Sequence, residues 1–110
     1  MPKLSKLTFA KLRTMNTARC EQCFHPCDDW SETDWATAVA GEVGEACNLI
    51  KKRRRGEDIS DRKIARELAD VVIYLDLLAD RMGIDLGDAV AEKFNVVSKR
   101  VGSDIELERT

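Results

Sequence analysis

The stretch that decides the fold spans residues 41–70 and reads GEVGEACNLIKKRRRGEDISDRKIARELAD. It contains two pairs of carboxylates with three-residue spacing: Glu42 with Glu45, and Glu67 with Asp70. On a helix, residues three apart share a face, with about 5–6 Å between their Cβ atoms. The basic turn between the pairs predicts two antiparallel helices that bring the pairs level with each other. Four acids placed in this way form either a solvated surface or a cation site.

Apolar residues recur at steps of three and four along most of the chain, which is the pattern of amphipathic helices. The expected helices are about Ser5 to Ala18, Ser31 to Arg55, Ser60 to Gly83, and Asp85 to Gly102. Ser31 with Asp34 forms a capping-box pattern, and Ser60 and Asp85 are expected N-caps. Without strand alternation or repeats, the pattern predicts an all-α fold, most simply a four-helix bundle.

The apolar stripes of the second and third expected helices are predicted to be the buried core. The second stripe contains Trp35, Val39, Val43, Ala46, Cys47 and Ile50. The third contains Ile64, Leu68, Val71, Val72, Leu75, Leu78 and Met82. Cys47 is interpreted as a small core residue. The polar tail after Gly102 is not expected to add to the core.

Length and composition predict one domain over residues 1–110. Because a chain this short buries a modest core, we expect a homodimer or homotetramer. The net charge of −2 argues against a nucleic-acid partner, although the cations at 51–55 suit either a solvated helix end or an anionic partner. No apolar run reaches the roughly 18 residues of a membrane span, and no apolar signal core opens the chain. These features predict a cytoplasmic location.

The acid pairs select a hard cation if they bind one. Oxygen ligands without histidine favour Mg²⁺, or Mn²⁺, over zinc. Protein-bound Mg²⁺ usually keeps several waters and shares its other positions with substrate phosphates. The residues alone therefore leave two alternatives, phosphate-ester chemistry or a solvated acidic face.

The segments GEVGEACNLIKK and ELADVVIYLDLLADRMGIDLGDAVAEKF resemble the MazG-like all-α nucleoside triphosphate pyrophosphohydrolases, whose signature is E-x-x-E, a spacer and E-x-x-D. The likeness extends over about residues 24–100. It implies Mg²⁺-dependent hydrolysis of a (deoxy)nucleoside triphosphate to the monophosphate and pyrophosphate, clearing non-standard or surplus nucleotides. The implied metal ligands and catalytic residues are Glu42, Glu45, Glu67 and Asp70.

The resemblance also implies substrate contacts. Lys93 would bind a phosphate, helped by Arg100 or the basic turn, and Asn95 stands near the position of a substrate-binding Asn in relatives. Tyr74 is either a hydroxyl that reaches the nucleotide or a half-buried core aromatic. For base stacking we expect Trp30 and His25, whereas Trp35 lies on the apolar stripe and is expected in the core.

Two departures leave alternatives open. Gly41 and Asn48 occupy positions where some relatives carry a further acid, so the residue that activates water is not assigned. A non-catalytic helical module that senses nucleotide, or binds a partner through residues 51–55 and the cysteine loop, is the alternative function.

The loop before the second expected helix is rich in potential zinc ligands. Its pattern C-x-x-C-x-H-x-C comprises Cys20, Cys23, His25 and Cys27. These supply the atoms for tetrahedral zinc, but zinc sites usually take two ligands from each of two separated segments. Reduced thiols are the alternative. Pro26 moves His25 out of helical geometry, which predicts an ordered loop or turn.

Overall fold

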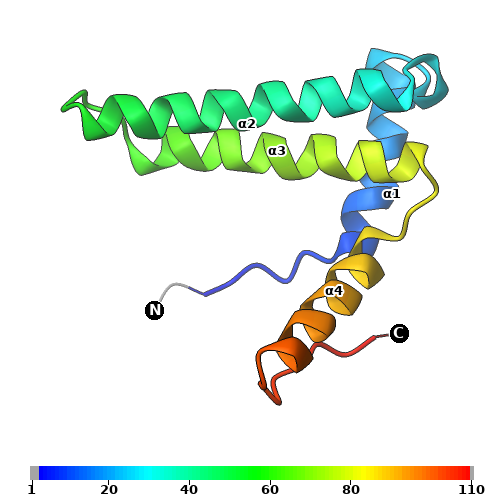
Figure 1. Cartoon of the computed structure of the whole chain (residues 1–110). Coiled ribbons are helices and arrows are strands. Elements are labelled where there is room, and N and C mark those ends of the chain that lie inside the picture. The colour runs from blue at the N-terminus through cyan, green and yellow to red at the C-terminus, as the bar shows by residue number, and fades with distance from the viewer. Residues whose placement is uncertain (1–2, 110) are drawn as a thin grey trace.

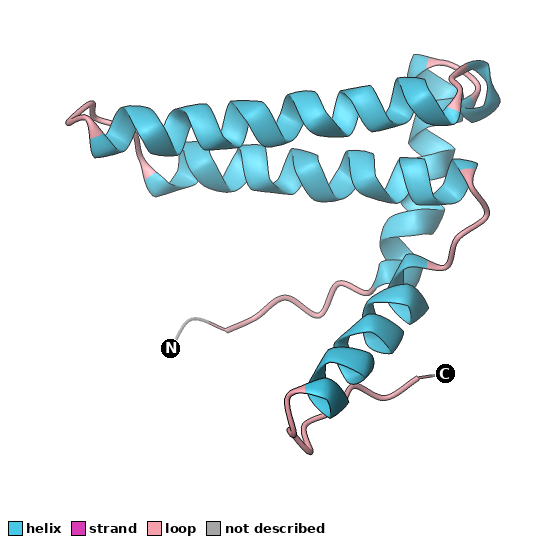
Figure 2. Cartoon of the chain, in the orientation of Figure 1, coloured by secondary structure: helices cyan, strands magenta, loops and turns pink. Residues whose placement is uncertain are grey.

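The computed structural model describes residues 3–109, and every regular element in that range is helical (Figure 2). The elements are α1 (Phe9–Arg19), the π-helix η1 (Cys20–Phe24), the 3₁₀-helix η2 (Cys27–Asp29), α2 (Glu32–Arg54), α3 (Asp61–Arg81) and α4 (Leu86–Arg100). The prediction of an all-α chain with four α-helices is confirmed. None of the described helices is both long and apolar enough to cross a bilayer.

Local capping signals set where the helices begin. The backbone N–H of Asp34 donates to Ser31 Oγ at 3.1 Å, and the Ser31 N–H donates to Asp34 Oδ2 at 2.9 Å. This reciprocal pair satisfies two backbone donors at the start of α2. Ser60 and Asp85 cap α3 and α4 as expected. Gly56 and Gly83 end α2 and α3 with φ values of 100° and 67°, a region that glycine adopts without a Cβ penalty.

The first helix differs from its prediction at both ends. It begins at Phe9 instead of Ser5, because the Thr8 hydroxyl caps it by accepting from the Lys11 N–H. It also continues into η1, so the first half of the cysteine loop is helical with the wider π spacing. His25 then adopts an extended conformation with φ −164°, in keeping with the expected effect of the proline that follows.

The arrangement of the helices differs from a closed bundle. Helices α2 and α3 lie side by side as a long antiparallel hairpin (Figure 1). Helix α1 crosses this hairpin near the start of α2 and the end of α3, and α4 extends away from the same end. Helix α4 contacts α1. The four helices therefore do not surround one common core within a single chain.

The main cluster of buried residues lies where η1, η2 and the α2–α3 hairpin meet. It consists of Cys20, Cys27, Trp35 and Leu77, with Trp30, Tyr74 and Leu78 packed against it. Trp35 is 2% exposed, and its indole Nε1 donates to the Cys27 carbonyl oxygen at 3.2 Å. The prediction that Trp35 is a core residue is confirmed.

Much of the predicted apolar stripe is nevertheless exposed. On α2, Val43, Cys47 and Ile50 face solvent, so the interpretation of Cys47 as a core residue is wrong. On α3, Leu68 and Val72 are also exposed. The physical reason is that each helix meets only one neighbour along this length, which covers a narrower strip than its apolar face.

A buried ion pair fixes α1 against α3. Asp76 is 1% exposed; its Oδ1 accepts from Arg13 Nε at 2.9 Å and its Oδ2 from Asn16 Nδ2 at 3.1 Å. Arg13 also donates to the Ile84 carbonyl oxygen at 3.0 Å, which ties in the α3–α4 connection. Asn16 Nδ2 also donates to the Ile73 carbonyl oxygen at 2.9 Å, so four hydrogen bonds from two α1 side chains hold α3 and its connection to α4.

Removing Arg13 should cost far more stability than removing a surface arginine. Arg13→Met leaves the Asp76 carboxylate buried without its counter-charge, and should lower the free energy of unfolding by about 3–5 kcal/mol. The matched control Arg53→Met breaks the exposed pair with Asp61 and should cost less than about 1 kcal/mol. Urea denaturation of both variants measures the difference. Equal losses would contradict a structural role for the Arg13 pair.

Candidate functional site

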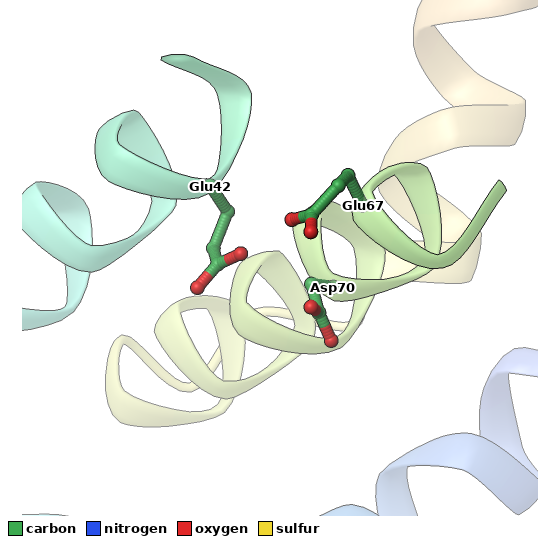
Figure 3. A group of neighbouring side chains, drawn as sticks. All are labelled: Glu42, Glu67 and Asp70. Carbon is green, nitrogen blue, oxygen red and sulfur yellow. The ribbon is translucent and has the colours of Figure 1, made fainter. Parts of the chain in front are cut away.

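Three of the four predicted acids meet between α2 and α3. Glu42 projects from α2 toward Glu67 and Asp70 on α3 (Figure 3). Each contributes one carboxylate oxygen to a group whose members all lie within 4.8 Å of one another. Among residues 3–109, this is the only group of three or more His, Cys, Asp or Glu residues so arranged. The hairpin register thus brings one acid of the first pair level with both acids of the second.

Two oxygens in this group are buried without a hydrogen-bond partner. They are Oε2 of Glu42 and Oε2 of Glu67. An ionised carboxylate that is removed from water without a partner is costly, and such groups are normally paired or coordinate a metal. The donor set is oxygen only and half-buried, which fits Mg²⁺ or Mn²⁺ and not zinc.

Burial and mutual repulsion both act on these carboxylates. Burial raises the pKa of Glu42 above its ordinary 4.5, and the charges of Glu45, Asp70 and Glu67 raise it further. The pKa of Glu67 is also raised by burial and by its contact with Glu45. Glu45 itself is exposed. It therefore stands at the solvent edge of the acidic group, close enough to act on both neighbours.

The raised pKa of Glu42 predicts that the metal-free protein loses folding stability as the pH rises. Below pH 4.5 the carboxyl is protonated in both the folded and the unfolded chain. As pH rises through the folded-state pKa, charging it costs more in the folded chain, so stability falls. Glu42→Gln should therefore be more thermostable than wild type near neutral pH, and this Tm advantage should shrink toward pH 4.5.

The matched control for this measurement is Glu57→Gln, in the α2–α3 turn, where Glu57 pairs with Arg55. Thermal unfolding in chelator across this pH range should show no such advantage for the control. Adding MgCl₂ should stabilise wild type more than Glu42→Gln. A Tm difference that is constant with pH and unaffected by Mg²⁺ would contradict the electrostatic interpretation.

An aromatic pocket of about 370 Å³ adjoins the acidic group. Its lining residues are Arg19, Phe24, His25, Trp30, Trp35, Asp70, Ile73, Tyr74 and Leu77. The His25 and Trp30 rings stack with centroids 4.7 Å apart, and the centroids of Trp30 and Trp35 are 4.5 Å apart. Asp70 belongs to both the acidic group and the pocket wall, so the two features form one continuous site.

Tyr74 occupies the boundary between the two parts. Its ring centroid lies 6.2 Å from that of Trp35. Burial raises the pKa of its phenol, and the charges of Glu42 and Asp70 raise it further. The hydroxyl is therefore protonated at neutral pH and can donate a hydrogen bond to a ligand. The predicted residues His25, Trp30 and Tyr74 are all brought together here.

The predicted residues on α4 are not brought to this site within one chain. Lys93 lines a separate shallow hollow with Phe94 and Val97, and Arg100 is exposed at the end of the helix. The Asn95 amide donates to the Leu107 carbonyl oxygen at 2.9 Å and accepts from the Leu107 N–H at 2.7 Å. Asn95 therefore holds the C-terminal tail, and its expected contact with substrate stays a prediction.

The cysteine loop does not gather a zinc ligand set. No three of its Cys and His ligand atoms approach one another in the way the carboxylates do. Cys20 and Cys27 are buried thiols, and Cys20 Sγ donates to the His25 carbonyl oxygen at 3.3 Å. Burial and neighbouring groups raise the pKa of Cys27 to about 12. These thiols support the loop that carries His25 and Trp30, whereas Cys23 is exposed.

Sequence reasoning did not identify Arg19, Phe24, Ile73 and Leu77 as pocket residues. For Leu77 a signal exists, because residues 70, 74 and 77 follow the helical three- and four-residue spacing on one face of α3. No comparable pattern marks Arg19 or Phe24. Their place depends on the π-helical turn and on the crossing of α1 over the hairpin.

The family model described as the MazG-like family matches residues 42–109. The matched segment contains all four acids and begins at Glu42. No curated protein matches the chain.

Proposed function

The chain belongs to the MazG-like family, and on this premise we propose that it hydrolyses a nucleoside triphosphate to the monophosphate and pyrophosphate with the help of Mg²⁺. The observation that carries the proposal is the junction of two features at Asp70. On one side lie buried carboxylate oxygens that lack a partner, and on the other lies a pocket lined with aromatic rings. A nucleotide presents complementary parts, since its sugar joins the metal-bound phosphates to the flat base.

In this proposal Glu42, Glu67 and Asp70 hold the metal, with Glu45 at the edge of the site. When bound, Mg²⁺ would offset the charge on the phosphate oxygens and lower the pKa of a coordinated water. The carboxylates would fix the polyphosphate end of the substrate through the metal that they hold, while His25 and Trp30 stack against the base. These contacts orient the phosphate chain at the acidic group and leave the base edge to set selectivity.

Release of pyrophosphate from a panel of nucleoside triphosphates tests the proposal. Glu42→Gln and Asp70→Asn each remove a metal ligand and should lower turnover at least about a hundredfold in the presence of Mg²⁺. Glu57→Gln, outside the site, should retain wild-type turnover. Wild-type turnover in both ligand variants would contradict the proposed metal site. A wild-type protein that binds a triphosphate and returns it intact would instead support the nucleotide-sensing alternative.

We also propose that the protein works as a homodimer or homotetramer. Leu68, Val72 and Leu75 follow helical spacing along α3 and are each at least 37% exposed, and Val43 and Ile50 are exposed on α2. Exposed apolar side chains gathered along two helices mark a surface that pairs with another protein surface. In such an assembly, α4 of a neighbouring copy supplies the cations Lys93 and Arg100 to the phosphates.

A charge placed on this α3 surface should disrupt the assembly. Leu68→Glu should shift the protein to a lower molar mass in size-exclusion chromatography with light scattering, because the carboxylate would have to be desolvated in the interface. Leu4→Glu makes the same change on a side chain that is 88% exposed ahead of α1, and should leave the mass unchanged. A monomeric wild type, or identical masses for all three proteins, would contradict the proposed interface.

A further inference from the structure

Arg19 is a cation at the rim of the aromatic pocket that belongs to no ion pair in the part of the chain described. It stands in the last turn of α1, and its guanidinium carbon lies 5.7 Å from the centroid of the Phe24 ring. The π-helical turn explains this contact. In η1 the His25 N–H donates to the Cys20 carbonyl oxygen at 3.0 Å, and this wide turn brings residues five apart onto one face.

The contrast with Arg13 on the same helix shows what Arg19 lacks. Arg13 donates to the Asp76 carboxylate and to the Ile84 carbonyl, whereas Arg19 makes neither a salt bridge nor a side-chain hydrogen bond among residues 3–109. Arg19 is also the one Lys or Arg among the nine residues that line the pocket. The pocket therefore has a single guanidinium available for an anion.

The Tyr74 phenol is within electrostatic reach of both Arg19 and the acidic group. Glu42 and Asp70 raise the pKa of the Tyr74 phenol, and Arg19 lowers it. The phenol hydroxyl thus interacts electrostatically with both the carboxylates and the guanidinium. A ligand that spans this boundary meets a site for its cation-bound part, a hydroxyl donor and a guanidinium, with aromatic rings beside them.

We propose that Arg19 is a substrate-binding residue, whose guanidinium pairs with a phosphate group of the nucleotide while the base stacks in the aromatic pocket. This inference rests on the proposed function and extends it to a residue outside the segment 42–109 that matches the family model. Guanidinium–phosphate pairs are charge-assisted and often bidentate, so they combine strength with orientation. Within one chain, Arg19 supplies the positive charge that Lys93 and Arg100 do not bring to this site.

Binding measured without hydrolysis tests the role of Arg19. Both tryptophans of the chain line the pocket, so intrinsic fluorescence reports its occupancy. The probes are the four common ribonucleoside monophosphates and the corresponding nucleosides, titrated in chelator. Arg19→Gln should weaken monophosphate binding about tenfold or more and change nucleoside binding less than about twofold, because only the phosphate contact is lost. Arg19→Lys, which keeps the charge, should retain part of the affinity.

Lys11→Gln is the matched control, because Lys11 is an exposed cation on α1 that does not line the pocket. It should bind every probe like wild type. Unchanged monophosphate affinity in Arg19→Gln would overturn the proposal, and so would an equal loss for nucleosides, an equal loss in Lys11→Gln, or no wild-type response to any monophosphate. Because this readout needs no turnover, it separates failure of the Arg19 contact from failure of the proposed hydrolysis.

Discussion

Like charges held together between two packed helices are the constraint on which the rest of the structure depends. The antiparallel packing of α2 on α3 brings Glu42 among the acids of the opposite helix and buries one oxygen each of Glu42 and Glu67. Without a cation, repulsion among these carboxylates destabilises the packing of α2 on α3 that brings them together. A divalent cation in this group would remove the repulsion, and the metal ion bound to a polyphosphate is such a cation.

The aromatic pocket depends on a different set of contacts, made by the short segment between α1 and α2. The Trp35 indole N–H donates a hydrogen bond to the Cys27 carbonyl oxygen, and Arg81 donates to the Trp30 carbonyl oxygen at 3.0 Å. Buried Cys20 and Cys27 fill the space beneath the loop. Together with the Arg13–Asp76 pair, these contacts fix α1 and the loop against the hairpin. The aromatic pocket shares Trp35 and Leu77 with this core.

The sequence patterns predicted the features of the fold that depend on residues close together in the chain. The capping box at Ser31 and the helical faces carrying the acids follow from residues three or four apart, so both could be read from the sequence. Contacts between residues far apart in the chain could not be predicted from the sequence. Asn95 bonds to a tail residue twelve positions away, Cys47 is exposed because no further helix within residues 3–109 covers it, and Arg19 reaches the pocket through a π-helical turn.

In the proposed site, Glu42, Glu67 and Asp70 together bind one divalent cation. The most direct measurement is the anomalous scattering of crystals soaked in Mn²⁺, which locates the ion without reference to activity. We expect a peak between α2 and α3 with oxygens of all three carboxylates about 2.0–2.6 Å away, the range of hard-cation ligands. A fully soaked crystal with no peak there, or with peaks only at other acids of the surface, would contradict it.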